Sequence, residues 1–248
     1  MSSMQAAFAA GARVVELDIH RTTDNQLAVF HDWQVDCRTN GQGNTASYSM
    51  AQLKNLDIGW GYTADGGMSY PFRGYKEAMP SLTEVFQSVE GEFLVNIKSS
   101  HTREAEALIR LLKKNPEFAE KIWSVYGAEI PIHYLQKHLP QISSFTKKEN
   151  KYCLLSHLLT GWFNYASPMC QNTIIAVPSN YTAYIWGWPH RFTQLMKHNN
   201  TQVIAMGPRN KAATSEGIDK MSELKPLENF SGYIWTNKAQ NLTEVFKP

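Results

Sequence analysis

The chain has 248 residues, of which 43% are apolar and 12% aromatic, and its 24 Lys and Arg residues against 22 Asp and Glu residues give a net charge of +2. This composition excludes a disordered chain, and the charge is too small for a protein whose main partner is nucleic acid. The length is that of a single compact domain and forces no domain boundary.

The chain carries no sign of a membrane-spanning segment. Its longest apolar runs, such as residues 173–177 and 203–206, fall far short of the about 20 residues that a spanning helix needs. Residues 1–10 are rich in alanine but lack the basic n-region of a signal peptide. We therefore expect a soluble protein that is cytoplasmic as the chain stands, and periplasmic or secreted if an upstream signal peptide has been lost.

Three cysteines, Cys37, Cys153 and Cys170, have spacings that fit neither a zinc site nor a disulfide framework. Buried free thiols are the favoured interpretation. A single bridge between Cys153 and Cys170 stays open as the alternative in an oxidising compartment.

Short β-rich runs alternate with helical patterns, which predicts parallel strands joined by crossover helices. Residues 2–11 are expected to be helical, because a serine precedes the apolar residues and a glycine ends the segment. The expected strands are residues 13–19, 26–30, 93–97, 122–126, 152–156, 173–177, 202–206 and 232–235. The further expected helices are residues 50–56, 82–89, a helix after Thr102, residues 191–198, and a short closing helix with Leu242, Val245 and Phe246. This alternation and the length match the about 250 residues of an eight-stranded α/β barrel.

Residues 37–80 differ in character from the rest of the chain. They hold seven of the fifteen glycines and only one short helical pattern. A connection this long in a compact domain is usually functional or an inserted subdomain. We interpret the chain as one domain, residues 1–248, with a loop-rich subdomain inserted at about residues 37–80 that covers one barrel face.

Two carboxylates come together in the first expected strand. Glu16 and Asp18 are two residues apart, so their side chains project to the same face of the strand. Two like charges held so close repel unless a positive charge lies between them, and a hard divalent cation such as Ca²⁺ or Mg²⁺ would supply it. The alternative is that both carboxylates lie on a solvated face.

His31 follows the apolar run that ends at Phe30. A histidine at the C-terminal end of a barrel strand lies where barrel enzymes keep their catalytic groups, and its near-neutral pKa suits general acid or base catalysis. A structural histidine with satisfied hydrogen bonds is the competing interpretation. The other histidines, such as His20 and His101, have no motif around them and are interpreted as structural or exposed.

These features occur in a fixed order that resembles the glycerophosphodiester phosphodiesterase family. The similarity extends over roughly residues 4–100 and continues more weakly through residues 232–237. No single motif is specific, but six in register make chance an unsatisfactory explanation. The motifs are Glu16-Leu17-Asp18, Thr23-Asp24, Phe30-His31-Asp32, Arg38 to Gly43, Leu56 to Gly59 and Met79 to Val85.

The resemblance implies a TIM-type barrel, a bound divalent metal ion, and hydrolysis of glycerophosphodiesters to glycerol 3-phosphate and an alcohol. Glu16 and Asp18 match the metal-binding carboxylates of the family, and His31 matches the second of its two catalytic histidines. Lys98 matches a basic residue that faces the phosphate, where it would offset charge on a phosphoryl oxygen. A surface lysine is the alternative for Lys98. The implied partner is a small glycerophosphodiester rather than nucleic acid, and the sequence does not indicate an oligomeric state.

The chain departs from the family in two places. Asn96 stands where the family carries a third metal-binding glutamate, so it is expected to ligate the ion through its amide oxygen and to weaken the site. The opening His-Arg-Gly motif is absent, and residues 2–11 resemble the helix that follows the first strand. With residues 26–30 counted as a hairpin extension of the strand at residues 13–19, the chain holds seven of the eight barrel strands. We therefore expect the first strand, with one catalytic histidine, to lie before residue 1, and the enzyme to be impaired without it.

Two further residues are expected to bind substrate. Arg191 follows Trp186-Gly187-Trp188 in a loop after an expected strand, and Trp235 ends the last expected strand. Packing within a long loop is an equally good interpretation of the aromatic residues. Arg209 is a weaker phosphate or headgroup contact of the same kind.

Three functional hypotheses follow. The first is a metal-dependent phosphodiesterase. The second is a non-catalytic relative that binds phosphodiesters or a partner. The third is a lyase that acts on phospholipids, as in the related sphingomyelinase D group, and would leave a stable cyclic phosphate.

Overall fold

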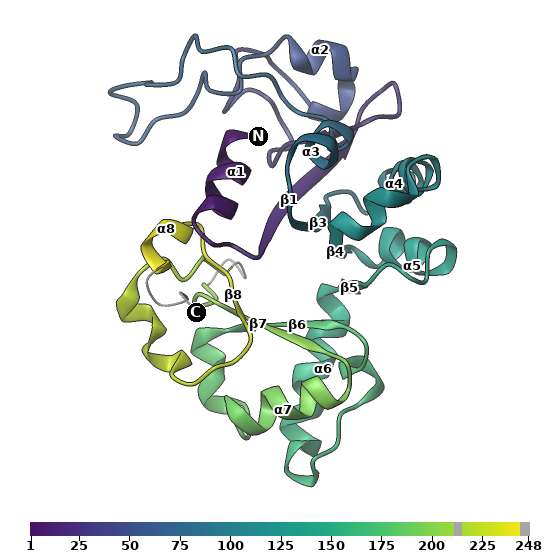
Figure 1. Ribbon diagram of the computed structural model, residues 1–248, viewed down its shortest axis with the longest axis vertical. Coiled ribbons are helices and arrows are strands. Elements are labelled where there is room, and N and C mark those ends of the chain that lie inside the picture. The colour runs from purple at the N-terminus through teal and green to yellow at the C-terminus, as the bar shows by residue number, and fades with distance from the viewer. Residues whose placement is uncertain (211–214, 244–248) are drawn as a thin grey trace. The chain divides into compact units, whose positions relative to one another are not determined.

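The structure is a computed structural model in which residues 1–210 and 215–243 are described (Figure 1). These residues form two compact units. Unit 1 comprises residues 1–5 and 14–142, and unit 2 comprises residues 6–13 and those from 143 onwards. Helix α1 (Ser2–Ala9), which the sequence predicts, has residues in both units.

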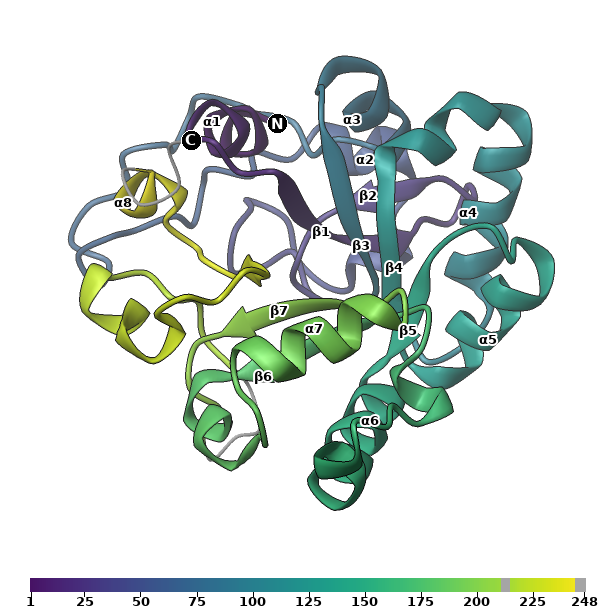
Figure 2. The same ribbon diagram turned by 60° about the horizontal axis from the view of Figure 1, so that its bottom comes forward.

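Unit 1 is built on a mixed sheet with the strand order β2-β1-β3-β4 (Figure 2). The strands are β1 (Val14–Arg21), β2 (Leu27–Val29), β3 (Glu92–Ile97) and β4 (Ile122–Gly127). Strands β1, β3 and β4 are parallel, whereas β2 returns antiparallel to β1. The turn between β1 and β2 places Asn25 at φ 62, a conformation that asparagine tolerates better than most residues. The expected hairpin after the first strand is therefore confirmed.

Two helices of unit 1 begin at side-chain caps. Ser81 and Glu84 form a capping box at the start of α3, and Ser49 and Gln52 form another at the start of α2. The core contains fully buried Phe86. The helices are α2 (Met50–Lys54), α3 (Leu82–Ser88), α4 (Arg103–Lys114), α5 (Glu129–His138) and the short 3₁₀ helices Thr45–Ser47 and Pro116–Lys121.

The loop-rich segment at residues 37–80 is held by side-chain hydrogen bonds rather than by regular structure. The buried Asp57 carboxylate accepts hydrogen bonds from the backbone of Gly59 at 3.0 Å and of Gly74 at 2.8 Å, which closes the loop between them. The Arg73 guanidinium lies over the rings of Trp60 and Tyr70, at 4.5 and 3.9 Å from their centroids. The assignment of this segment as an inserted subdomain of a single domain stays a prediction.

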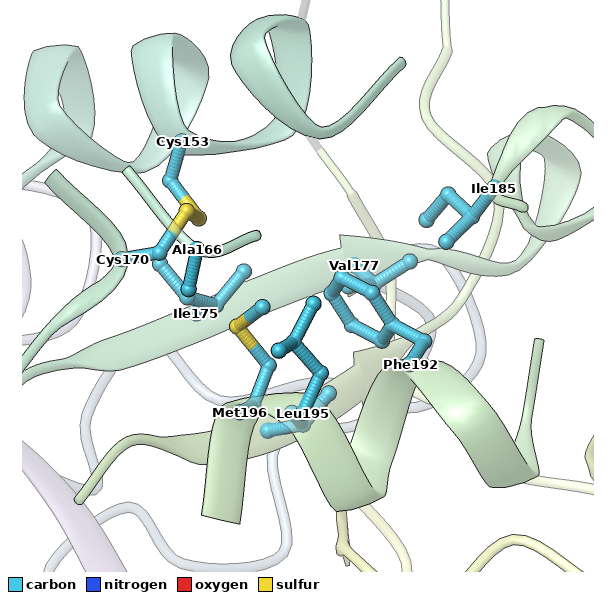
Figure 3. Packing of buried hydrophobic residues seen from close by; sticks show 10 residues of the cluster. Cys153, Ala166, Cys170, Ile175, Val177, Ile185, Phe192, Leu195 and Met196 are labelled. Atoms are coloured by element: carbon cyan, nitrogen blue, oxygen red, sulfur yellow. A yellow bond between two sulfur atoms is a disulfide. The ribbon is translucent and has the colours of Figure 1, made fainter. Parts of the chain in front are cut away.

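Unit 2 contains a parallel sheet with the order β6-β7-β8. Its core packs Ile175 and Val177 of the sheet against Phe192 and Met196 of α7 (Figure 3). The strands are β5 (Ser144–Thr146), β6 (Ile174–Pro178), β7 (Gln202–Met206) and β8 (Tyr233–Ile234). The helices are α6 (Lys147–Thr160), α7 (His190–His198), α8 (Ala239–Leu242) and the 3₁₀ helices Gly161–Phe163, Pro168–Cys170, Ser179–Tyr184 and Met221–Leu227.

The expected strand at residues 152–156 is wrong, because these residues lie inside helix α6. A capping box between Thr146 and Glu149 begins the helix and fixes the backbone before the apolar residues are reached. A short apolar run cannot be distinguished from a buried helix segment by periodicity alone. In the expected closing helix, Leu242 belongs to α8, whereas Val245 and Phe246 lie outside the described residues.

The favoured interpretation of the cysteines as buried free thiols is also wrong. Cys153 of α6 and Cys170 form a disulfide with their Cα atoms 5.0 Å apart, which is the alternative that the sequence left open (Figure 3). Cys37 is a free thiol but is exposed rather than buried. The disulfide is part of the unit 2 core and joins α6 to the 3₁₀ helix Pro168–Cys170.

Candidate functional site

Strand β1 carries the two predicted carboxylates on one face. Glu16 is half-buried and Asp18 is buried, and the alternation of the strand gives His20 the same direction. Both carboxylates are therefore partly shielded from water. Burial of a charge costs free energy unless hydrogen-bond or ionic partners compensate for the lost water. The neighbouring parallel strands supply these partners.

Asp18 is paired with two residues of the chain around β3. The register of the sheet places Asn96 directly beside Asp18, and the Asn96 Nδ2 donates a 2.7 Å hydrogen bond to Asp18 Oδ1. The Lys98 Nζ lies 3.4 Å from the same oxygen, with both side chains largely buried. The structure thus brings together Asp18, Asn96 and Lys98, three of the residues that the sequence predicts for the site.

Glu16 has a partner that the sequence reading missed. Tyr126, on β4, donates a 2.8 Å hydrogen bond from its hydroxyl to Glu16 Oε1. Burial, followed by the nearby negative charge of Glu16, raises the pKa of the Tyr126 hydroxyl well above its usual value. Tyr126 is therefore a permanent hydrogen-bond donor to the carboxylate. Tyr126 lies beside Asn96 in the register between β3 and β4. This position would have indicated Tyr126 as a site residue, but it is known only once the order of the strands in the sheet is known.

His31 lies just beyond β2 and is held by its neighbours in the sequence. The Phe30 backbone amide donates a 3.1 Å hydrogen bond to the carbonyl of Asp18, which brings the end of β2 beside the carboxylate strand. His31 Nδ1 lies 2.6 Å from Asp32 Oδ1, while the His31 ring stays largely exposed. This contact leaves Nε2 directed away from Asp32.

The Asp32 carboxylate is the group that orients His31. Partial burial alone would raise its pKa, but the hydrogen bond with His31 and the nearby charge of Arg38 outweigh burial, and the pKa of Asp32 is lowered from its usual value. Arg38 Nε donates to the other carboxylate oxygen at 3.2 Å. The pair is therefore an ionised carboxylate against an exposed imidazole, an arrangement that suits proton transfer.

The histidines His20 and His101 were interpreted only as structural or exposed from the sequence. His20 is fully buried, its ring packs edge-on against Trp33 at 5.2 Å, and burial lowers its pKa. Glu104, in the first turn of α4, is buried and accepts a hydrogen bond from Ser99, and its carboxylate lies 3.4 Å from His101 Nδ1. His20 is therefore neutral near pH 7, whereas His101 faces a buried carboxylate.

The chemistry of the donor set decides whether the site can hold a metal ion. Among residues 1–210 and 215–243, no group of three or more His, Cys, Asp or Glu side chains forms a metal cluster. Glu16, Asp18 and Asn96 provide two carboxylates and one amide, which are oxygen donors of the kind that hard divalent cations prefer. The Asn96 amide presents its nitrogen to Asp18, so its oxygen would have to turn to serve as a ligand. The residues therefore fit a hard cation, held through two charges instead of three.

Arg191 and Trp235, the predicted substrate-binding residues, belong to unit 2. Arg191 lies at the start of α7 with its guanidinium 5.3 Å from the ring of Trp186. The Trp235 backbone amide donates a 2.9 Å hydrogen bond to the carbonyl of Ala205, next to β8. Their role in substrate binding stays a prediction.

Comparisons with known proteins agree with these features. Residues 1–227 match the model of the glycerophosphoryl diester phosphodiesterase family. A glycerophosphodiester phosphodiesterase from Caldanaerobacter subterraneus is 35% identical over 99 residues, or 40% of this chain and 37% of that protein. One from Bacillus subtilis is 30% identical over 152 residues, or 56% of this chain and 51% of that protein. The chain thus spans about half or less of the length of these curated relatives.

A solved structure extends the likeness to the fold. The glycerophosphoryl diester phosphodiesterase domain of a Mycobacterium tuberculosis protein matches with a TM-score of 0.73 and 13% identity, covering 98% of this chain and 92% of that domain. The fold is therefore the TIM-type α/β barrel that the sequence predicts, and its class is that of the phosphodiesterase barrels. The chain belongs to the glycerophosphoryl diester phosphodiesterase family.

No helix in the described part of the chain is both long and apolar enough to cross a bilayer.

Proposed function

We propose that this protein hydrolyses glycerophosphodiesters to glycerol 3-phosphate and an alcohol. The observation that carries the proposal is that Asp18, Asn96 and Lys98 lie together. Asp18 Oδ1 lies 2.7 Å from the Asn96 Nδ2 and 3.4 Å from the Lys98 Nζ. The ammonium of Lys98 can bind a phosphate, and the carboxylate of Asp18 can bind a positive counterion beside it. Membership of the family supports this substrate class.

Lys98 stabilises negative charge in the proposed reaction. Its ammonium is largely removed from water, so its interaction with a phosphoryl oxygen is stronger than that of an exposed lysine. In the resting protein the ammonium is balanced by Asp18. A bound phosphodiester presents a second anion to the same cation, which draws the phosphate toward the end of β3.

His31 transfers a proton in the proposed reaction. Asp32 holds Nδ1 of the ring, so Nε2 is the nitrogen that can exchange a proton with the substrate or the leaving alcohol. The exposure of the ring allows direct contact with a small substrate. Removal of such a proton-transfer group typically slows a reaction by about 10² to 10⁴.

Glu16, Asp18 and Asn96 would hold a divalent cation, Ca²⁺ or Mg²⁺, through their side-chain oxygens. When bound, the ion supplies a Lewis-acid charge next to the phosphoryl group. Tyr126 keeps the Glu16 carboxylate in place through its 2.8 Å hydrogen bond. The Asp18 carboxylate also pairs with the Lys98 ammonium, so less of its negative charge is available to the ion. This predicts modest affinity for the ion.

The Cys153–Cys170 disulfide bears on the compartment. Disulfides persist mainly in oxidising compartments. We therefore propose a periplasmic or extracellular location in place of the cytoplasmic one expected from the first ten residues.

The proposed function is tested by product analysis with glycerophosphocholine as substrate. The full chain should release glycerol 3-phosphate, and chelation with EDTA should abolish the release until Ca²⁺ or Mg²⁺ is restored. The His31→Asn variant should be slower by at least a hundredfold. His198→Gln is the matched control, because His198 lies in α7 of unit 2 and its Nδ1 lies 2.8 Å from the carbonyl oxygen of Gln194 in the same helix.

Three results would contradict the proposal. A stable cyclic phosphate as the end product would identify a lyase. Binding of glycerophosphocholine without turnover under every divalent ion would identify a non-catalytic relative. Equal rates for His31→Asn and wild type would remove His31 from the reaction.

A further inference from the structure

Helix α6 directs its large apolar side chains outward, away from the unit that it belongs to. Tyr152, Leu155 and Leu159 recur at intervals of three and four residues, which places them on one side of the helix, and all three are exposed. The row continues into the following 3₁₀ turn with Trp162 and Phe163, which are 65% and 82% exposed. An ordinary surface helix has the opposite arrangement.

The opposite side of α6 already provides its attachment to unit 2. Cys153 is fully buried and is joined to Cys170 (Figure 3). Leu154 packs against the same core. His157 is buried and its Nε2 lies 3.0 Å from the carbonyl oxygen of Trp186. The outward residues are therefore not needed to hold the helix in place.

We call the exposed apolar side chains of α6 and of the residues that follow it the α6 face. Patches of this kind on a protein usually mark a site of interaction. The α6 face consists of Tyr152, Leu155, Leu158, Leu159, Trp162, Phe163, Tyr165 and Met169, all of which are exposed.

The charge of α6 is mostly positive. The helix contains Lys147, Lys148 and Lys151 against the one carboxylate of Glu149. Residues 150–215 contain five Lys and Arg residues and no Asp or Glu, although the whole chain has 22 Asp and Glu residues. A surface with exposed Trp, Phe, Leu and Tyr on a helix that is rich in lysine complements the interface of an anionic bilayer.

A second copy of the chain is a less suitable occupant. Two α6 faces in contact would bring together two helices that each carry three lysines and only one carboxylate. Like charges placed opposite each other across an interface cost binding free energy. A bilayer of anionic lipids has the complementary charge and accepts the side chains without a shaped pocket.

We propose that the α6 face is the surface through which this protein binds anionic lipid bilayers. Phe163, Trp162 and Leu159 enter the boundary between headgroups and acyl chains, while Lys151 contacts the anionic headgroups. This peripheral binding is independent of catalysis, so it can be tested whether or not the phosphodiesterase activity is found.

The test is cosedimentation of the full chain with large vesicles of phosphatidylcholine alone, or with about a third phosphatidylglycerol. The protein should bind the anionic vesicles at least tenfold more tightly, and added salt should weaken the binding. The variant Leu159→Ser/Phe163→Ser should lose at least tenfold in affinity, and Lys151→Gln about fivefold.

Matched controls distinguish binding through the α6 face from non-specific adsorption to vesicles. Met68→Ser removes an exposed apolar side chain from unit 1, and Lys113→Gln removes an exposed lysine from α4, so neither should alter binding. The altered side chains are exposed, so thermal unfolding should stay unchanged in all variants. Quenching by brominated lipid should fall selectively in Trp162→Phe.

Three outcomes would overturn the proposal. Absence of binding to both vesicles would remove the lipid surface as a partner. Equal binding to neutral and anionic vesicles would remove the role of charge. A dimer in sedimentation that dissociates on Leu159→Ser/Phe163→Ser, without vesicle binding, would assign the α6 face to a second copy of this chain.

Discussion

The ammonium of Lys98 lies 3.4 Å from the carboxylate of Asp18, and both side chains are largely buried. The same Asp18 oxygen accepts a hydrogen bond from Asn96 at 2.7 Å. A buried carboxylate is stable only when such partners replace water. Asn96 and Lys98 therefore take the place of water around the Asp18 carboxylate, and Asp18 in turn holds the Lys98 ammonium beside the strand ends.

The Lys98→Met change should lower kcat/KM for glycerophosphocholine by about 10² to 10³, because it removes a positioned charge from the proposed transition state. Lys98→Arg should retain part of the rate, since it keeps the charge but changes its shape. Steady-state kinetics measure both effects. The matched control is Lys113→Met in α4, an exposed position. An unchanged kcat/KM in Lys98→Met would exclude the lysine from the reaction.

The Asp32 carboxylate should make the protein less stable in acid. Its pKa is lowered in the folded state, so its stabilising effect is complete above the ordinary Asp value of 3.8 and is lost as the pH falls through the lowered value. Asp32→Asn should therefore flatten the decline of the unfolding free energy below about pH 4. Urea unfolding at several pH values measures the decline.

Arg38→Gln provides the intermediate case for Asp32, since it removes one of the two partners that lower the pKa of the carboxyl and leaves His31 in place. Its acid decline should lie between those of wild type and Asp32→Asn. An identical acid decline in all three proteins would show that Asp32 makes no such contribution.

Much of the fold and part of the site could be predicted because local sequence carries them. The alternation in β1 placed Glu16 and Asp18 on one face, and the Ser81 capping box marked the start of α3. The family motifs identified Asn96 and Lys98 as neighbours of Asp18, and the sheet register places Asn96 directly beside it. These features depend on spacing within one segment or on motif order.

The remaining features depend on pairing between distant segments. Tyr126 meets Glu16 only because β4 lies beside β3 with a particular register, and a tyrosine in a strand has no signal of this kind by itself. Cys153 and Cys170 meet because the chain folds back after α6 and brings the 3₁₀ helix Pro168–Cys170 beside it. The erroneous strand at residues 152–156 concealed this pairing. Periodicity predicts which face a residue occupies, and it does not reveal the residue opposite.

The Tyr126→Phe change tests whether the hydroxyl positions Glu16. Loss of a hydrogen bond to a carboxylate costs about 1.5 to 3 kcal/mol, and outer partners of metal ligands typically alter metal affinity by about 10- to 100-fold. We expect a higher concentration of divalent ion for half-maximal activity and little change in kcat at saturating ion. Tyr134→Phe in α5 is the control. A reduced kcat at unchanged ion affinity would assign Tyr126 a different role.

Reduction of the Cys153–Cys170 disulfide should destabilise the protein. The two cysteines are 17 residues apart, and the cross-link of a loop of this size restricts the unfolded chain by about 3 kcal/mol in the entropic description. The Cys153→Ser/Cys170→Ser variant should therefore unfold at lower urea concentration than wild type, and dithiothreitol should affect only wild type. Cys37→Ser is the control, because that thiol is exposed and unpaired by any disulfide in the described chain. Equal urea midpoints with and without dithiothreitol would show that the disulfide contributes nothing to stability, and α6 would then be held by apolar packing and the contact of His157 with Trp186.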